Sequence, residues 1–272
     1  MLCSYDGIIE YERPDTWPAE LTELFTRELP ALEAYERRRA EVDVICRQDV
    51  MARINVPQNA HKPRRNEIVQ QADAILSAYK LLGFHCTRLT EYEVADIGAH
   101  GLRPLDRSLV KERLEQAACR GLLSREVKKR LLSAHQADDD GRRGMTHFVN
   151  CRSVLFCESD VGRLFRSWGG EALYNSHEDR GDTGPVLRRI GKPAIIVTAI
   201  PLSKLRTCFD NVAARFLWKF LSDRDIPIDQ AADIETHTVE AVPASCILEI
   251  ITYSDRRFDL LTLCSSWSES VD

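Results

Sequence analysis

The sequence of 272 residues contains no apolar run long enough to span a bilayer, so we expect no transmembrane helix. Its first ten residues contain two acids and no Lys or Arg, unlike a secretory signal peptide. A formal net charge of −5 at pH 7 argues against a protein that binds polyanions over its whole surface. These absences predict a cytoplasmic protein with no membrane partner.

The cysteines lack the spacing of a metal site or of a disulfide framework. There are nine, an odd number, at positions 3, 46, 86, 119, 151, 157, 208, 246 and 264, and no two form a Cys-x-x-Cys pair. This pattern is typical of reduced, buried thiols. Cys151 and Cys157 have no histidine at ligand spacing, and His85 and Cys86 diverge on a predicted strand, so we expect no metal. A Gly-rich phosphate loop is also absent, since Gly169-Gly170 lacks the flanking residues of such a loop.

What is present is an ordinary globular composition, with 44% hydrophobic and 29% charged residues. The length suits one catalytic domain with an appendage. Residues 1–80 have the helical period of an appendage, interrupted at Pro30 and at a Pro-rich loop over Pro57–Arg65. We therefore divide the chain into a helical appendage, 1–80, and a second domain, 81–272.

The second domain begins with a strand that leads into a polar segment. An apolar run ending at Phe84 precedes His85-Cys86-Thr87-Arg88. A short helix follows, with Thr90 as N-cap and Glu93 at the N3 position of a capping box. Gly101, followed by Leu102, is a natural end for that helix. The segment thus predicts a strand, a helix and a Gly-Leu loop, with a histidine at the end of the strand.

A second polar strand lies near the other end of the sequence. Ile234–Ile250 is rich in β-branched residues, starts on Glu235 and turns at Pro243. The proline stands eight residues after Glu235, and aliphatic residues follow at twelve and fifteen. Glu240 competes for the role of the functional carboxylate. Because the two glutamates are five positions apart, a regular strand would place them on opposite faces, and we favour Glu235.

Between these segments the pattern predicts two further strands and several helices. Lys192–Pro201 has the composition of a buried strand, and Met145–Cys157 is interpreted as one long strand or two with a kink. Helices are expected near 109–132, over Asp160–Phe165 and over Leu205–Leu221. Positions 103 to 143 contain eleven Lys or Arg residues and seven Asp or Glu residues, which gives a local charge of +4. That region is either a solvated helical surface or a wall that faces a polyanion.

Together, the His-x-Thr strand, the Gly-Leu loop and the late glutamate strand resemble the ADP-ribosyltransferase superfamily. The spacing after Glu235 is similar to that of DarT-type toxins, which modify nucleic acid. The resemblance covers roughly residues 80–255. It implies an α+β fold in which two small antiparallel sheets, split apart, form a cleft for NAD, and it implies NAD as co-substrate.

The resemblance also implies roles for individual residues. Glu235 would be the catalytic carboxylate, and His85 would donate a hydrogen bond to a ribose hydroxyl of NAD. The backbone of Cys86 would bind the nicotinamide amide, while Thr87 and Arg88 would hold the neighbouring ribose or phosphate. An aromatic residue of the middle region would lie against the nicotinamide ring. The candidates are Phe156, Trp168 and Tyr174, each of which is equally compatible with plain packing at a turn.

These features predict an enzyme that transfers ADP-ribose from NAD to an intracellular macromolecule, most readily RNA or DNA, as a toxin or phage-defence effector. An antitoxin protein is a further partner that this setting implies. Asp233-x-Glu235 replaces the Glu-x-Glu of arginine-specific enzymes, although protein targets stay open. The alternatives are a non-catalytic NAD-binding or nucleotide-binding interaction domain, a two-histidine phosphoesterase and an RNA 2′-phosphotransferase. The phosphoesterase would need a second His-x-Thr, and His237 is followed by Thr238-Val239 instead.

Overall fold

The computed structural model describes residues 7–208, 210–228 and 234–271. The fold is α+β, and the chain forms two compact units. Unit 1 comprises Met1–Lys80, Pro201–Ser203 and Phe209–Ile234, and unit 2 comprises Leu81–Ile200, Lys204–Cys208 and Glu235–Asp272. Within the part of the chain described, no helix combines the length and the apolar character needed to cross a membrane.

Unit 1 is a helical body whose core is built from aromatic side chains. Its helices are α1 (Ala19–Arg27), α2 (Leu29–Gln48), α3 (Val50–Ile54), α4 (Lys62–Leu76) and α12 (Val212–Ser222), preceded by the short strand β1 (Ile8–Ile9). The ring of Phe216 on α12 packs edge-on against Tyr11 and Trp17, with centroids 5.2 and 5.0 Å apart. Phe220, one turn later, lies 5.2 Å from Phe25 of α1. Because such rings bury large apolar areas, α12 is an integral part of unit 1.

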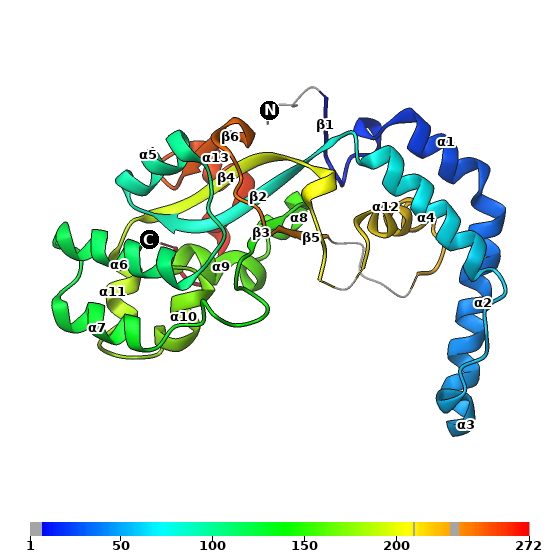
Figure 1. The fold of residues 1–272 in the computed structure, drawn as a ribbon, viewed down its shortest axis with the longest axis horizontal. Helices are drawn as coiled ribbons and strands as arrows, with labels where there is room; N and C mark the ends of the chain where they lie inside the picture. Colours follow the sequence, from blue (N-terminus) through cyan, green and yellow to red (C-terminus); the bar gives the residue numbers. More distant parts are fainter. Residues whose placement is uncertain (1–6, 209, 229–233, 272) are drawn as a thin grey trace. The chain divides into compact units, whose positions relative to one another are not determined.

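The sheet of unit 2 has the strand order β5-β3-β2-β4-β6 (Figure 1). Its strands are β2 (Lys80–Leu89), β3 (Thr146–Val149), β4 (Lys192–Pro201), β5 (Glu235–Thr238) and β6 (Ile247–Thr252). The pairs β2–β3, β3–β5 and β4–β6 are antiparallel. Two separate sheets were expected, but the strands form one hydrogen-bonded path. Its two longest strands, β2 and β4, have ten residues each and lie side by side in the middle of this order.

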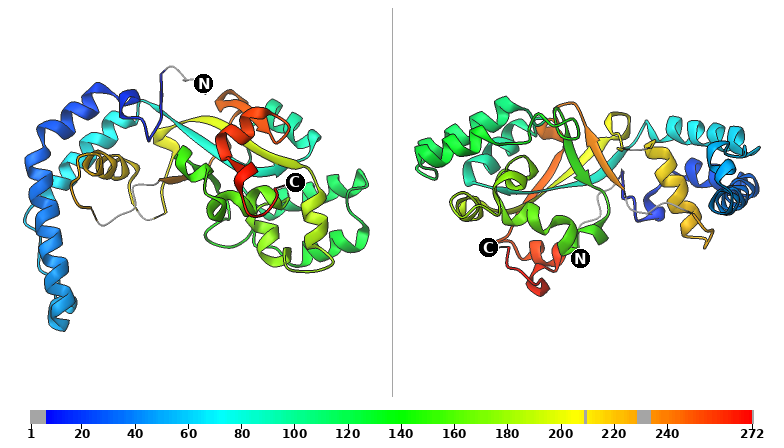
Figure 2. Two further views of the ribbon diagram at one scale, coloured as in Figure 1. Left: turned by 180° about the vertical axis from the view of Figure 1, so that it is seen from behind. Right: turned by 90° about the horizontal axis from the view of Figure 1, so that it is seen from below.

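Helices cover both sides of this sheet, with α5 and α6 on one side and α13 on the other (Figure 2). Their bounds are α5 (Glu91–His100), α6 (Arg107–Cys119), α7 (Arg125–Ser133), α8 (Arg152–Leu155), α9 (Glu158–Arg166), α10 (Glu171–His177), α11 (Gly184–Arg189) and α13 (Arg256–Thr262). The 3-10 helices are η1 (Pro14–Thr16), η2 (Leu202–Lys204), η3 (Ala244–Cys246) and η4 (Cys264–Ser266). Leu114 of α6, Leu131 of α7 and Trp168 belong to one buried cluster.

The predicted strand, helix and Gly-Leu loop are confirmed, but His85 lies in the middle of β2 and not at the end of the strand. Thr90 and Glu93 form a complete capping box at the start of α5, and Gly101 ends the helix with φ +85°. A side chain at Gly101 would place its Cβ 1.9 Å from the carbonyl oxygen of Val242, so only glycine fits. Leu102 and Val242 then exchange two backbone hydrogen bonds of 2.8 Å. The loop after the histidine strand is thereby joined to the segment that follows Glu235.

Three sequence-based expectations need correction. The segment Met145–Cys157 is neither one long strand nor two strands with a kink, because the chain turns after Val149 and forms α8. The loop over Pro57–Arg65 is shorter than expected, since α4 begins at Lys62 with proline in its first turn, where the missing N–H costs no helical bond. The division at residue 80 recurs as the first boundary between the units, but Phe209–Ile234 returns to unit 1 because the aromatic face of α12 needs that core.

Candidate functional site

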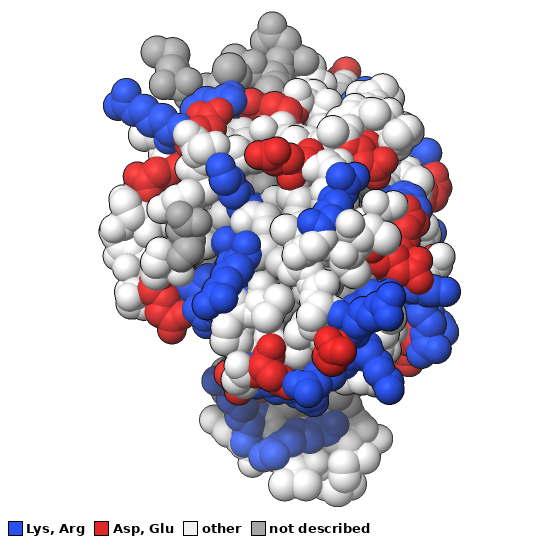
Figure 3. Space-filling model, turned by 90° about the vertical axis from the view of Figure 1, so that its left-hand side faces the viewer, with Lys and Arg blue, Asp and Glu red and all other residues white. Residues whose placement is uncertain are grey.

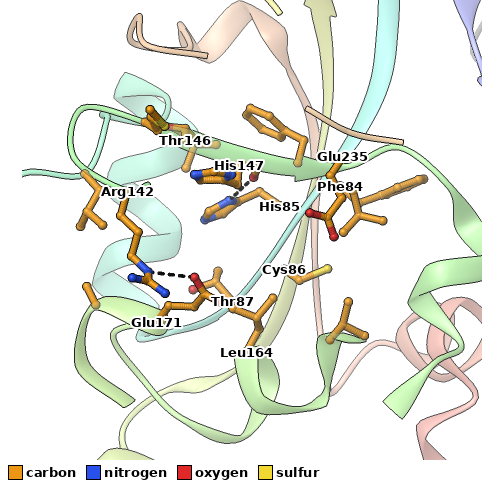
Figure 4. Close-up of a pocket in the computed structure, with 18 of the residues that line it drawn as sticks. Phe84, His85, Cys86, Thr87, Arg142, Thr146, His147, Leu164, Glu171 and Glu235 are labelled. Atoms are coloured by element: carbon orange, nitrogen blue, oxygen red, sulfur yellow. Dashed lines mark hydrogen bonds and ion pairs between the residues drawn. The ribbon is translucent and has the colours of Figure 1, made fainter. Parts of the chain in front are cut away.

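A cavity of about 260 Å³ in unit 2 is lined by four of the eight predicted site residues. Its wall includes four consecutive residues of β2, Phe84–Thr87, the whole of β3, and Glu235 at the start of β5. Figure 4 shows Glu235 on one side of this pocket and the ion pair of Arg142 with Glu171 on the opposite side. His85, Cys86, Thr87 and Glu235, which are far apart in the sequence, therefore line one pocket.

The register of the sheet explains how these residues come together. Val149 of β3 is the partner of Phe84 on β2 and also of Glu235 on β5. The first residue of β5 is therefore brought level with the centre of β2 through a single intervening strand. His85 is the next residue of β2 after Phe84, so it is one position away from Glu235 along the strands, and both line the cavity. A shift of this register by one residue would reverse the faces of all these side chains.

His85 is held in one orientation and is kept neutral. Its Nδ1 lies 2.9 Å from the carbonyl oxygen of His147, which can only accept, so Nδ1 carries the proton. Burial lowers the pKa of His85, and the nearby charge of Arg113 lowers it further against the raising effect of that hydrogen bond. In the neutral imidazole Nε2 then has a free lone pair. We expected His85 to donate to a ribose hydroxyl, but in this tautomer it would accept from one.

Of the two candidate glutamates, only Glu235 lines the pocket. Glu240 lies beyond the end of β5, is exposed, and accepts a hydrogen bond of 2.8 Å from the ammonium of Lys204. An exposed ion pair of this kind contributes little to stability and needs no further role. The expected choice of Glu235 over Glu240 agrees with this placement. Asp233, the first residue of the Asp-x-Glu motif that ends on Glu235, is outside the described residues.

Cys86 and Thr87 lie in the pocket wall as expected, whereas Arg88 does not. Burial raises the pKa of the Cys86 thiol, so it stays protonated and is not a nucleophile. The side chain of Arg88 is buried on the other side of β2, where it donates to the carbonyl oxygens of Phe165, Ile190 and Val271 at 3.1, 2.8 and 2.7 Å. Arg88 therefore ties together distant segments of the chain, and its predicted contact with the ligand is wrong.

None of the three predicted aromatic residues lines the pocket. Trp168 is completely buried and donates its indole N–H to Glu93 at 2.9 Å. Tyr174 is buried beneath the guanidinium of Arg163, and Phe156 is exposed away from the cavity. The aromatic side chains in the wall are instead Phe84 and Phe148, which come from the strands themselves. The prediction failed because Trp168 and Tyr174 pack into the interior, while Phe156 is exposed on another surface.

A second cavity of about 310 Å³ adjoins the first. The two share six lining residues, namely His85, Thr87, Leu102, Arg103, Leu109 and Arg113. Beyond these, the second cavity is lined by residues that include Tyr92 and Gln116, and it reaches Ile196 on β4. The two cavities thus share part of their walls, and together they are called the cleft below. A pair of adjoining cavities suits a ligand with two end groups better than a compact one.

Sequence reasoning missed Arg113, which lies where the two cavities meet. Its guanidinium donates through Nε to Glu93 at 2.7 Å and stacks 4.9 Å from the centroid of Trp168. Burial by itself would raise the pKa of Glu93, but Arg113, the backbone N–H of Thr90 and Trp168 together lower it, so the carboxylate is ionised. In the sequence, only the capping box of Thr90 and Glu93 indicated a part of this cluster. The other partners of Glu93 are Arg113 on α6 and Trp168, which are distant in the sequence.

Two further histidines beside the pocket were also missed. His147 on β3 lines the cavity and is the direct partner of His237 on β5, with ring centroids 5.4 Å apart. Within the described chain, Nε2 of His147 and Nδ1 of His237 have no hydrogen-bond partner although both atoms are buried. Burial lowers the pKa of His237, and the nearby His147 lowers it further. The paired Thr-His dipeptides at 146–147 and 236–237 are a signal that could have indicated this juxtaposition.

Several of the basic side chains between positions 103 and 143 form ion pairs in the structure. Arg103, Arg107, Arg113, Arg130 and Arg142 each pair with a carboxylate. Arg125, Lys128 and Lys129 of α7 form no ion pair with any residue that the structure describes. Figure 3 shows Lys and Arg side chains gathered on the face of unit 2 that carries α6 and α7, interspersed with Asp and Glu. The unpaired positive charge is therefore concentrated on α7.

Comparison with known proteins yields no relative for this chain. No protein-family model matches it, and neither the curated proteins nor the solved structures contain a match. The function therefore has to be argued from the site itself.

Proposed function

We propose that this protein is an NAD-dependent mono-ADP-ribosyltransferase, with a nucleic acid as its acceptor. The observation that carries the proposal is the placement of His85 and Glu235 in the wall of one pocket. These are the two residues that the resemblance to the superfamily requires together. Under this proposal the continuous sheet of unit 2 corresponds to the strands that surround the NAD cleft in that superfamily.

The chemistry asks for few groups. Cleavage of the bond between nicotinamide and ribose develops positive charge on the ribose, as in glycoside hydrolysis. A carboxylate beside the sugar stabilises that charge, and Glu235 at the start of β5 would supply it. His85, neutral and oriented by its bond to the carbonyl of His147, would accept a hydrogen bond from a ribose hydroxyl at Nε2. Phe84 and Phe148 in the wall would provide an apolar surface beside the nicotinamide leaving group.

The acceptor is inferred from the charge of unit 2. The three unpaired cations of α7 offer charges to a phosphate backbone, and the +4 between positions 103 and 143 contrasts with the negative charge of the whole chain. This supports RNA or DNA over an average protein surface. A toxin or phage-defence effector, held in check by an antitoxin protein, is the setting that this activity implies.

The proposal is tested by nicotinamide release from NAD. We expect the wild-type protein to consume NAD, and we expect Glu235→Gln to lower the rate by about 10²- to 10³-fold while NAD affinity, measured by calorimetry, changes little. Glu240→Gln is the matched control and should keep the wild-type rate. Full activity of Glu235→Gln together with an inactive Glu240→Gln would show that the catalytic carboxylate is Glu240 and not Glu235. A wild-type protein that leaves NAD intact would contradict the enzymatic proposal.

The acceptor is tested separately. Incubation with NAD labelled in the adenylate portion, together with separate pools of RNA, DNA and protein, should transfer label to a nucleic acid pool. Label found only in protein would keep the enzyme class and exclude the proposed acceptor.

A further inference from the structure

The guanidinium of Arg113 is fixed on one side and unoccupied on the other. Its Nε donates to the buried carboxylate of Glu93 at 2.7 Å, and its plane stacks over Trp168. Its Nη2 is covered by the protein and has no hydrogen-bond partner among the residues that the structure describes. Buried donors are nearly always paired in folded proteins, so the hydrogen bonds that the protein offers this guanidinium are incomplete, and its side chain lines both cavities.

The surroundings of Arg113 hold it rigidly. Glu93 accepts hydrogen bonds from the backbone N–H and the hydroxyl of Thr90, at 2.8 and 2.7 Å, and from the indole of Trp168 at 2.9 Å. Each acceptor position of that carboxylate is thereby used, and the carboxylate cannot turn away from the arginine. The side chain of Arg113 consequently loses little freedom when a ligand binds, and its planar fork suits a phosphate group.

The position of Arg113 along the cleft identifies the class of ligand. Arg113 lines both cavities, of which the first is also lined by Glu235 and the second by Tyr92 and Ile196. A dinucleotide carries its diphosphate in the middle and its two nucleosides at the ends. We propose that Arg113, positioned by Glu93 and Trp168, binds the diphosphate of a dinucleotide that lies along both cavities.

This assignment rests on the proposed function for the choice of a dinucleotide, and it replaces the role first expected of Arg88. The other arginines of the cleft are less suitable. Arg103 is half exposed and pairs with Glu112 at 2.9 Å, and Arg120 stacks over the ring of Tyr92 at 4.3 Å. Arg142 lines the first cavity only and already pairs with two carboxylates, those of Asp139 and Glu171. A phosphate of a nucleic acid backbone suits Arg113 less well, because such a chain needs an open surface and the arginine is three-quarters covered by protein.

The experiment compares the binding of ADP-ribose and adenosine to the full chain by calorimetry. Arg113→Lys keeps a positive charge for Glu93 but has no second arm, so it should fold normally and still bind ADP-ribose about 10- to 100-fold more weakly, with adenosine affinity unchanged. Arg113→Gln should lose at least as much. Lys111→Gln is the matched control, since it removes one charge from the same helix, where Lys111 pairs with Glu115 on an exposed face.

Several outcomes would overturn the assignment. These are wild-type affinity for ADP-ribose in Arg113→Lys, an equal loss for adenosine, or no binding of ADP-ribose to the wild-type protein. Weaker binding of a single-stranded oligonucleotide with unchanged ADP-ribose binding would give the phosphate to nucleic acid instead. The proposed function fails independently of this site, because a protein that binds ADP-ribose through Arg113 but releases no nicotinamide from NAD would keep the site and lose the enzyme.

Discussion

The two units of this chain differ in what they place in a cavity wall. Unit 2 places a neutral histidine, an arginine and a carboxylate in a cleft. Unit 1 has an aromatic core, and its exposed apolar side chains lie near the end of α2, in α3 and just after α3. They are Val44, Ile45, Val50, Met51, Ile54 and Val56. Unit 2 also exposes apolar side chains, namely Leu122, Phe156, Val239, Tyr253, Leu260 and Leu263, so the difference between the units is the cleft. The contrast teaches that the candidate chemistry belongs to unit 2 alone, so variants in the two units should have separable effects.

The largest effect is expected from removal of residues 1–80. The chain that begins at Leu81 keeps every pocket residue but exposes the face of α12 that Tyr11, Trp17 and Phe25 cover, and burial of such rings is a dominant stabilising contribution. We expect it to be insoluble or to bind a hydrophobic dye strongly. A folded, soluble 81–272 protein would show that the division at residue 80 is sufficient and that α12 does not need unit 1.

The next largest effect concerns Arg88. Arg88→Met leaves three buried carbonyl oxygens without their donor, and we expect it to lower the free energy of unfolding by about 3–5 kcal/mol. Chemical denaturation measures this. Arg113→Lys serves as the comparison and should lose much less stability. An Arg88→Met variant that keeps most of its free energy of unfolding but binds the ligand weakly would show that Arg88 belongs to the site.

A smaller effect is expected from His85, because it contributes one hydrogen bond to the ligand. His85→Ala should weaken NAD binding about 10- to 100-fold, corresponding to the loss of one well-placed bond in a buried site. Calorimetry with NAD and steady-state nicotinamide release together separate binding from turnover. His100→Gln, on the exposed face of α5, should behave as the wild type. Unchanged NAD affinity in His85→Ala would remove the imidazole from the site.

The cations of α7 should affect only the acceptor. We expect the double variant Lys128→Gln, Lys129→Gln to lower label transfer to nucleic acid several-fold, and to reduce the salt dependence of nucleic acid binding by about one to two charges. Nicotinamide release without acceptor should stay the same. A uniform loss of both activities would indicate damage to the fold, and no change in either would restore the interpretation of a solvated helical surface.

The smallest effect is expected from the exposed apolar residues of unit 1. Met51→Gln and Ile54→Gln replace side chains that are 61% and 69% exposed, so the free energy of unfolding should change by no more than about 0.5 kcal/mol. Nicotinamide release should be unaffected. A measurable loss of activity in either variant would contradict the separation of the two units.

Local signals in the sequence predicted the parts of the fold that depend on few neighbours. The capping box at Thr90 and Glu93, the glycine at the end of α5 and the bounds of β4 are as expected. Helix caps involve residues three positions apart, and a buried strand is visible in its composition. The pairing of β5 with β3 also agrees with the expected meeting of His85 and Glu235, because the order of the two motifs was recognised.

The sequence could not predict features that depend on packing between distant segments. Arg88 and Arg113 have the same chemistry, yet one is taken up by three carbonyl groups and the other faces the cleft. The choice is made by Glu93 and Trp168, which come from different elements. Three aromatic residues were expected in the site because of their residue type. In the structure Trp168 and Tyr174 are buried in the interior, and Phe156 is exposed away from the cleft.

The most direct test of the central claim is a crystal structure of Glu235→Gln with NAD, since this variant should bind the dinucleotide without cleaving it. The account predicts that the nicotinamide ribose lies beside position 235, that Nε2 of His85 accepts a hydrogen bond from a ribose hydroxyl, and that the diphosphate meets Arg113. NAD bound elsewhere on the protein, with the cleft empty, would contradict it.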